Sequence, residues 1–330
     1  MRQAILSIST LAFLATAAGA ADMPVKATRA VVEQPPQVMG YVEIYGGWAR
    51  TKEATTSCFD GLCNSRGAES SGGWVLGGAG RASWWWAPNY SLQLDAQAEG
   101  TSYKRTFCCG GNFERESTHA YLIGGHANWR DSSRGLIGVF GGAGDATNFF
   151  TFSSVRHGLI GAEGQLYGGP VTLYGQVGYD STLGSISSGN FDSLQAWFVR
   201  GTGRFYVNPN FRLEGTVLYA NGDVDFVSGV PVTQDFKTWL WRAKGEYKFA
   251  GSPFSLFALY EGSQTKFDQT DPSFTQTRKV TDNRVLVGVR LYLNENTLQF
   301  NDRNGTTLDI IAPFSAPSFI YRPSGLMIAL

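Results

Sequence analysis

The feature that most constrains this chain is a strict alternation of apolar and polar residues with a period of two. In Ser91–Arg105 (SLQLDAQAEGTSYKR), Leu92 and Leu94 share one parity, while Asp95 and Glu99 share the other. Successive side chains of a β-strand point to opposite faces, so this segment predicts a strand whose two faces contact different solvents.

Twelve segments of this kind follow one another, and together they predict an all-β fold. Charged residues make up only 16% of the chain, below the roughly 25% of ordinary soluble domains, and Gly is frequent at 41 residues. This composition suits a β-protein with one large apolar face. The predicted strands lie near residues 38–50, 73–86, 91–105, 117–130, 135–147, 156–167, 170–181, 193–207, 210–221, 236–249, 254–267 and 281–293.

The connections between these segments alternate in length. Those after the odd-numbered segments are long and polar, as at Thr51–Gly72 and Asn221–Asp235. The others are short and rich in turn residues, as at Ala87–Tyr90 and Gly168–Gly169. All long connections would therefore lie on one rim of an antiparallel up-and-down barrel. Transmembrane β-barrels of bacterial outer membranes show this sorting, with short periplasmic turns and long extracellular loops.

The alternation alone also fits a soluble barrel with its apolar face inside. Two further observations favour lipid outside: twelve strands enclose a lumen wider than apolar side chains readily fill, and only a membrane barrel has reason to sort its connections. Aromatic residues of the apolar parity, many near strand ends, predict an interfacial girdle. They are Trp48, Trp84, Trp86, Trp129, Tyr179, Tyr219, Trp239, Trp241, Tyr247 and Phe249.

The N-terminus predicts export. Arg2 precedes an apolar stretch, Ala4–Ala18, and the small-residue site Ala18-Gly19-Ala20 follows, as in secretory signal peptides. The stretch is too short to span the roughly 30 Å hydrocarbon layer. Residues 1–20 are thus expected to be removed, leaving 21–37 as a periplasmic segment. The remaining chain keeps 26 of the 27 basic residues against 27 acidic ones, so no attraction to nucleic acid is expected.

The chain continues past the last predicted strand. Thr297–Ile311 is predicted to form a small hairpin about Asn301–Gly305, with arms too short to span, since a transmembrane strand needs about 9–11 residues. We therefore expect a barrel over 38–293 and a tail over 294–330 that is periplasmic or inserted into the lumen. The alternative counts the tail as two more strands, which gives a barrel of 14.

The chain resembles the porin-like outer-membrane β-barrel proteins of alphaproteobacteria. The likeness is carried by the signal peptide followed by ADMPVKA at 21–27, by MGYVEIYGGWAR at 39–50 and by RVLVGVRLYL at 284–293. It implies a channel in the outer membrane of a Gram-negative cell, with outer-membrane lipid around it and small hydrophilic solutes or ions passing through it. The tail is a departure, because such barrels usually end at their last strand, typically on an aromatic residue.

Four cysteines, Cys58, Cys63, Cys108 and Cys109, all lie in the first two predicted extracellular loops. The compartment is oxidising and the C-x-x-C spacing of zinc sites is absent, which favours disulfides. Neighbouring Cys108 and Cys109 are about 3.8 Å apart at Cα, less than the usual 4.4–6.8 Å of a disulfide. Bridges from Cys58 and Cys63 to Cys108 and Cys109 are therefore expected.

No catalytic site is expected. The chain has three His residues, His119, His126 and His157, and neither a G-x-S-x-G nor an H-E-x-x-H motif. A hydrolase barrel would also need Ser and His at one height of the lipid-facing wall, whereas His126 falls on the lumen parity. The sequence accordingly predicts no enzyme, metal or cofactor.

The lumen parity collects most strand charges. They form either a ladder of ion pairs that satisfies the barrel interior or a pore lining that biases passing ions, and the two roles are compatible. The acidic positions are Glu43, Asp95, Glu99, Glu163, Asp180, Glu214, Glu246 and Glu261; the basic ones are Arg81, Arg200, Arg204, Arg212, Arg242, Lys244, Lys248, Arg284 and Arg290.

Hairpin register gives four predicted lumen pairs: Arg81 with Asp95, Arg204 with Glu214, Arg242 with Glu261 and His157 with Asp180. All the bases except Arg81 lie in the last five predicted strands, so opposite walls are expected to differ in sign. The charges left unpaired are mainly basic, which predicts a weak preference for small anions. The competing hypothesis is a closed barrel with a structural or surface-interaction role. The unpaired bases on this prediction are Arg200, Arg212, Lys244, Lys248, Arg284 and Arg290.

Overall fold

The structure is a computed structural model, and it describes residues 38–60, 62–105, 114–147, 154–183, 191–226, 232–270 and 274–320. The predicted signal peptide, the segment 21–37, Cys108, Cys109 and the end of the tail lie outside the described residues. Within the described part, no helix has the length and apolar character needed to cross a membrane.

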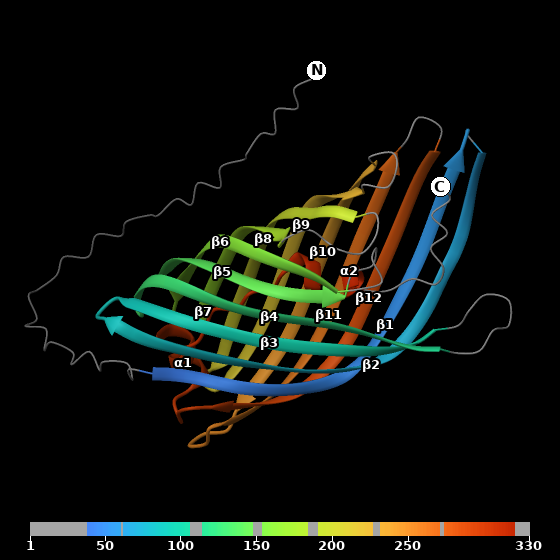
Figure 1. Ribbon diagram of the computed structural model, residues 1–330. Helices are drawn as coiled ribbons and strands as arrows, with labels where there is room; N and C mark the ends of the chain where they lie inside the picture. The colour runs from blue at the N-terminus through green and yellow to red at the C-terminus, as the bar shows by residue number, and fades with distance from the viewer. Residues whose placement is uncertain are drawn as a thin grey trace, which may run out of the picture. The chain divides into compact units, whose positions relative to one another are not determined.

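Twelve antiparallel strands form one closed barrel, in which each strand pairs with its neighbours in sequence and β1 pairs with β12 (Figure 1). The prediction of a twelve-stranded all-β barrel is confirmed, and the alternative of 14 strands is wrong. The strands are β1 Val38–Phe59, β2 Leu62–Ala87, β3 Tyr90–Arg105, β4 Glu114–Asp131, β5 Gly135–Thr147, β6 Ser154–Gly168, β7 Val171–Thr182, β8 Phe191–Asn208, β9 Phe211–Phe226, β10 Val232–Lys248, β11 Phe254–Thr270 and β12 Phe274–Tyr292.

The short connections lie where the turn residues predicted them. Gly169, between β6 and β7, has φ +54°, and Gly251, between β10 and β11, has φ +66°. Glycine adopts this left-handed backbone without the steric cost that a Cβ brings, so these two turns depend on it. We call this end of the barrel the short-turn rim.

The long connection Thr51–Gly72 differs from its prediction as a loop. β1 and β2 remain paired up to Phe59 and Leu62, and β12 pairs with β1 as far as Phe274. β1, β2 and β12 are thus the longest strands, with 22, 26 and 19 residues, and they rise beyond the other strands in Figure 1. Polarity suggested a loop, but the many Thr and Ser residues of this hairpin are compatible with solvent-exposed strands.

The apolar parity lies outside the barrel, as predicted. Leu94, Ile160 and Trp239 are 55%, 68% and 46% exposed, whereas Asp95 is 6% exposed. The aromatic residues predicted to form the girdle also point outward, among them Trp48 at 45% and Tyr179 at 44% exposure. This exterior suits contact with lipid acyl chains rather than with water.

The tail lies inside the barrel, and the hairpin predicted for Thr297–Ile311 is wrong. The segment instead forms α1 Leu298–Asn304, followed further on by the short helices η1 Pro313–Ser315 and α2 Pro317–Ile320. Thr297 caps α1 by accepting a hydrogen bond from the Phe300 N–H at 3.2 Å, a typical helix start. Gly305, read as a hairpin turn residue, follows the helix end and donates its N–H to the Asn301 carbonyl at 2.8 Å.

The tail runs through the lumen from the short-turn rim toward the long connections. At its start, the Gln299 N–H donates to the Pro209 carbonyl in the β8–β9 turn at 3.1 Å. At its described end, Ser318 Oγ lies 2.9 Å from Thr265 Oγ1 of β11. The tail thus divides the lumen into two regions, a short-turn half around residues 302–309 and a long-connection half around residues 310–318.

Candidate functional site

Every charged residue predicted to line the lumen is buried or half-buried inside the barrel. This follows from the strand period, because the opposite parity carries the apolar side chains that face outward. Among the charged strand residues of this face, Arg130 on β4 and Arg278 and Asp282 on β12 were not predicted; they are 1%, 5% and 0% exposed. Arg130 has the parity of His126, and Arg278 and Asp282 have that of Arg284, so the strand period of two could have identified them.

The four predicted lumen pairs are in contact. Arg81 Nε lies 3.6 Å from Asp95 Oδ2, and Arg204 Nε lies 2.9 Å from Glu214 Oε2. Arg242 forms an ion pair with Glu261, and His157 Nδ1 lies 2.8 Å from Asp180 Oδ1. The first three pairs are directly opposite in register, while His157 reaches Asp180 diagonally, since its direct partner is Thr182.

Two carboxylates of the tail bind arginines of the barrel wall. Asp302 Oδ1 lies 2.7 Å from Arg204 Nη1, and Asp302 Oδ2 accepts a hydrogen bond from Thr172 Oγ1 at 2.7 Å. Asp309 forms an ion pair with Arg200, which also donates to the Asp309 carbonyl at 3.0 Å. The tail therefore supplies counter-charges that the strands do not.

The wall also satisfies the backbone between α1 and η1, which has no regular hydrogen bonding of its own. Buried carbonyl groups require partners, and here side chains of four strands provide them. In each case the side chain of the wall residue donates to a backbone carbonyl of the tail: Gln93 to Leu308 at 2.7 Å, Arg130 to Gly305 at 2.7 Å, Gln176 to Asp309 at 3.0 Å and Arg204 to Thr307 at 2.9 Å.

The protonation of the tail carboxyls follows from these contacts. Burial raises the pKa of Asp309, but Arg200, Arg81 and Arg204, together with the hydrogen bond from Arg200, lower it by more, so this pKa lies well below its usual range. Burial likewise raises the pKa of Asp302, and the charges of Arg204 and Arg212, together with hydrogen bonds from Thr172 and Thr307, more than offset that effect. Both carboxyls are therefore charged in the docked tail at neutral pH.

Glu246 on β10 joins the remaining bases into a network. Its carboxylate lies 2.7 Å from Arg212, 3.0 Å from Arg290 and 3.7 Å from Lys244. Arg290 also pairs with Glu43, and Arg284 pairs with Glu99 and Asp282.

Most of the bases expected to be uncompensated therefore have an acidic partner, and the predicted basic excess is smaller than the sequence suggested. The short turns gave no register for β1 with β12 or for β9 with β10, where Glu43 lies opposite Arg290 and Glu246 opposite Arg212. In addition, Asp302 and Asp309 come from the tail, outside the strand pattern.

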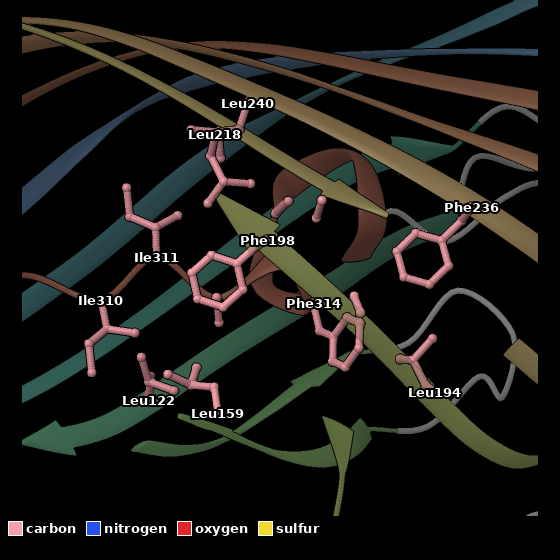
Figure 2. Packing of buried hydrophobic residues seen from close by; sticks show 14 of the residues in the cluster. Leu122, Leu159, Leu194, Phe198, Leu218, Phe236, Leu240, Ile310, Ile311 and Phe314 are labelled. Atoms are coloured by element: carbon pink, nitrogen blue, oxygen red, sulfur yellow. The ribbon is translucent and has the colours of Figure 1, made fainter. Parts of the chain in front are cut away.

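The long-connection half of the lumen is apolar (Figure 2). Phe314 of the tail lies 6.1 Å from Phe236 and 5.6 Å from His157, measured between ring centroids. Leu218, Leu240 and Phe198 also point inward and are fully buried. The labelled members of this cluster are Leu122, Leu159, Leu194, Phe198, Leu218, Phe236, Leu240, Ile310, Ile311 and Phe314.

These inward apolar side chains were not predicted, because the parity rule assigned the lumen face to polar residues. The signal was present where alternation stops, as in Trp197-Phe198-Val199, Val217-Leu218-Tyr219 and Trp239-Leu240-Trp241. Continuous apolar runs indicate a strand that is covered on both faces.

His126 occupies the boundary between the two halves. Its ring nitrogens lie 2.7 Å from Glu163 Oε1 and 3.2 Å from Asp95 Oδ2, and the residue is 3% exposed. The carboxylates hold the imidazole in place on both sides. Among the described residues, no group of three His, Cys, Asp or Glu side chains is arranged to hold a metal ion.

Two polar cavities border the tail. The first, about 100 Å³, lies between α1, Asp309 and the wall around Arg81, Lys244 and Arg290. The second, about 60 Å³, lies further along the lumen beside Glu99, Arg284 and Ser315. Both are polar and large enough for several water molecules. Tyr45, Gln97, Glu99, Arg242 and Glu261 border both cavities, so one strip of charged wall connects them.

The disulfide differs from the prediction. Cys58 bonds to Cys63, its direct neighbour across the β1–β2 hairpin, with 4.0 Å between the two Cα atoms. The expected bridges from these residues to Cys108 and Cys109 are therefore wrong. The predicted bridges assumed that Thr51–Gly72 is a loop. In the paired hairpin that it forms instead, Cys58 and Cys63 are direct cross-strand neighbours. Cys108 and Cys109 lie outside the described residues.

Comparison with known proteins adds to the fold. No protein-family model matches the chain, and no curated protein matches it. Among solved structures, an outer membrane channel from Pseudomonas putida F1 superposes with a TM-score of 0.51 at 8% identity, over 79% of this chain and 98% of that chain. A FadL homologue from Pseudomonas aeruginosa gives a TM-score of 0.36 at 8% identity, over 78% of this chain and 90% of that chain. The first likeness shows that the fold is that of an outer-membrane β-barrel.

Proposed function

We propose that the protein is an outer-membrane channel for small hydrophilic solutes or ions, closed by its own C-terminal tail. The chain is exported by its signal peptide, surrounded by outer-membrane lipid and not an enzyme. The likeness to porin-like barrels of alphaproteobacteria is consistent with this proposal, as is the channel role of the structurally similar Pseudomonas putida protein.

The observation that carries the proposal is that a separate segment, rather than strand side chains, fills the lumen. Twelve strands enclose more space than their own side chains occupy. Here the described tail occupies much of that space and leaves two small polar cavities beside one strip of charged wall. Among the described residues, the tail is joined covalently to the barrel through β12 and otherwise held by noncovalent contacts, so its undocking would not break the barrel.

Undocking of the tail would also determine the ion selectivity of the open channel. Asp302 and Asp309 would leave with it, and Arg200, Arg204 and Arg212 would lose a counter-charge. The open wall would then be more basic than the closed one. We expect a weak anion preference that decreases with salt, because the Debye length is about 8 Å at physiological ionic strength.

A closed barrel with a structural or surface-interaction role is the second candidate. The apolar cluster of Figure 2 favours it, since Ile310, Ile311 and Phe314 bury apolar surface as a permanent core would. The two functions differ in whether the tail undocks under membrane conditions.

Planar-bilayer recording tests the proposal on the full chain and on the variant Asp302→Asn/Asp309→Asn. Neutral side chains weaken the contacts with Arg200 and Arg204, so the variant should be open for a larger fraction of time than the parent. Asp131→Asn is the matched control, because Asp131 is a carboxylate in the β4–β5 turn that bonds to Ser133. Reversal potentials under a salt gradient should show a weak anion preference. Absence of conductance in both proteins would contradict the proposal and favour the closed barrel.

A further inference from the structure

Three lysines face one another on the outside of the barrel. Lys237 of β10 is the direct partner of Lys266 of β11, which is the direct partner of Lys279 of β12. All three are exposed, as are Arg50 and Lys52 on the adjoining strand β1. We call these five residues the basic belt. Like charges directly opposite each other destabilise a sheet unless something compensates them.

The basic belt lies just beyond the aromatic girdle. Arg50 follows Trp48 on the outer face of β1 by two residues, and Lys237 precedes Trp239 on β10 by two. Two residues correspond to roughly 7 Å along a strand, in both cases toward the long connections. Since Trp and Tyr mark the level of the membrane interface, the basic belt lies at the headgroup level of the extracellular leaflet.

Acidic residues compensate the basic belt only in part. Asp268 lies 2.8 Å from Lys266, and it shares a register row with Asp235 and Asp223, one step further from the membrane. Asp268 also attracts Lys237, but within the ranges that the structure describes, Arg50, Lys52, Lys237 and Lys279 form no ion pair of 4.0 Å or less. The membrane-facing edge of the belt thus remains positive.

The same strands carry an apolar hollow below the basic belt. Gly46, Val287, Ala258 and Gly245 follow one another across β1, β12, β11 and β10 in a single register row. The two glycines and the alanine of this row leave a depression of about 680 Å³, which Val287 and bulkier neighbours such as Ile44 and Tyr247 border. Val287 is eight residues from Lys279, roughly 26 Å along a strand tilted by about 40°, so the hollow lies about 20 Å below the belt.

We propose that this face binds a lipid whose headgroup carries phosphate, in the extracellular leaflet. The lysine ammonium groups and Arg50 contact the phosphate, which supplies the compensating charge, and an acyl chain extends down the apolar face toward the hollow. Clusters of Lys and Arg at a membrane surface bind anionic lipid headgroups by this attraction. Like charges in register are then tolerated because the lipid is always present.

Tryptophan quenching tests this site, because Trp48, Trp74 and Trp239 lie beside it. The full chain is refolded in phosphatidylcholine vesicles that contain a minor fraction of phosphatidic acid with brominated acyl chains. Quenching by this lipid, relative to brominated phosphatidylcholine, gives the ratio of the two association constants. We expect the parent protein to prefer phosphatidic acid by about tenfold or more at low salt, and K237Q/K266Q/K279Q to lose most of that preference.

The matched control is Arg134→Gln, which removes an exposed base at the short-turn rim, where the side chain is 83% exposed. It should keep the preference of the parent protein. Equal quenching of all proteins by brominated phosphatidylcholine shows that the variants are folded; if the triple variant fails this check, Lys237→Gln alone should still lower the preference. Inorganic phosphate should not abolish it at concentrations comparable with the lipid. A parent protein without preference, a triple variant that retains it, or abolition by inorganic phosphate would overturn the proposal.

Discussion

In the short-turn half of the lumen the tail is held by charges and hydrogen bonds, whereas in the long-connection half it is held by apolar packing. Asp302 and Asp309 bind Arg204 and Arg200 in the first region, and Phe314 packs against Phe236 in the second. The two regions are consecutive along one segment of about 20 residues.

The two halves of the lumen contribute differently to docking of the tail, one to its position and the other to its stability. Buried ion pairs contribute little net stability, because the loss of hydration offsets the attraction, but breaking one partner is costly. Apolar burial stabilises without directional constraint, by about 25 cal/mol per Å². The charged half therefore fixes where the tail docks, and the apolar half provides most of the free energy that keeps it docked.

Replacing Phe314 by Ala should have the largest effect. Phe314 is 2% exposed, and deletion of a buried Phe side chain typically costs about 3–5 kcal/mol. Hydrogen exchange of the amides between residues 306 and 318 measures the free energy of tail undocking. This free energy should fall by about the same amount, so that exchange becomes faster. Phe249→Ala removes an outward side chain that is 43% exposed, and it should leave tail exchange unchanged. Equal effects of the two changes would contradict the role of the apolar half.

Asp309→Asn should have the next largest effect. It leaves the Arg200 side chain, 1% exposed, without its anionic partner, and loss of one member of a buried pair costs about 3–5 kcal/mol. We expect about 3 kcal/mol, because Asp309 borders a cavity that water can enter. Adding Arg200→Gln should recover part of the loss in a double-mutant cycle. If the two changes were simply additive, the pair would not be coupled.

Acidification should weaken the charged half alone. An Asp in the undocked tail has a pKa of about 3.9, and docking lowers the pKa of Asp302 and Asp309, so both stabilise docking fully above about pH 4. This stabilisation is lost as pH falls through the lowered values. The difference in undocking free energy between the parent and Asp302→Asn/Asp309→Asn should be constant from pH 8 to about pH 5 and shrink below about pH 4. Shrinkage near pH 6 would contradict this assignment.

Removal of the disulfide should have the smallest effect on the lumen. Cys58 and Cys63 close the tip of the β1–β2 hairpin, next to exposed Phe59 and Leu62. Cys58→Ser/Cys63→Ser should increase exchange at the hairpin tip, while tail undocking changes by less than about 0.5 kcal/mol. A larger change in tail exchange would show that the hairpin contributes to docking.

The two halves of the lumen also differ in how well the sequence predicted them. Most of the charged wall was predictable, because strand period and hairpin register together place Arg204 opposite Glu214 and Arg81 opposite Asp95, although Arg130 and Asp282 were missed. The apolar half was not, because Phe198 and Leu240 interrupt the alternation and their partner is the tail. The path of residues 294–320 depends on contacts between distant parts of the chain, and local patterns such as Asn304-Gly305 favoured a hairpin instead.

The most direct test of the account is a reversible cross-link between tail and wall. Ser318 Oγ and Thr265 Oγ1 are 2.9 Å apart, so Thr265→Cys/Ser318→Cys should form a disulfide that holds the tail in the lumen. In planar bilayers we predict no channel openings from the oxidised variant, and openings like those of the parent protein after addition of a reductant, with the reduced parent as control for Cys58 and Cys63. Equal conductance before and after reduction would contradict the claim that the tail closes the lumen.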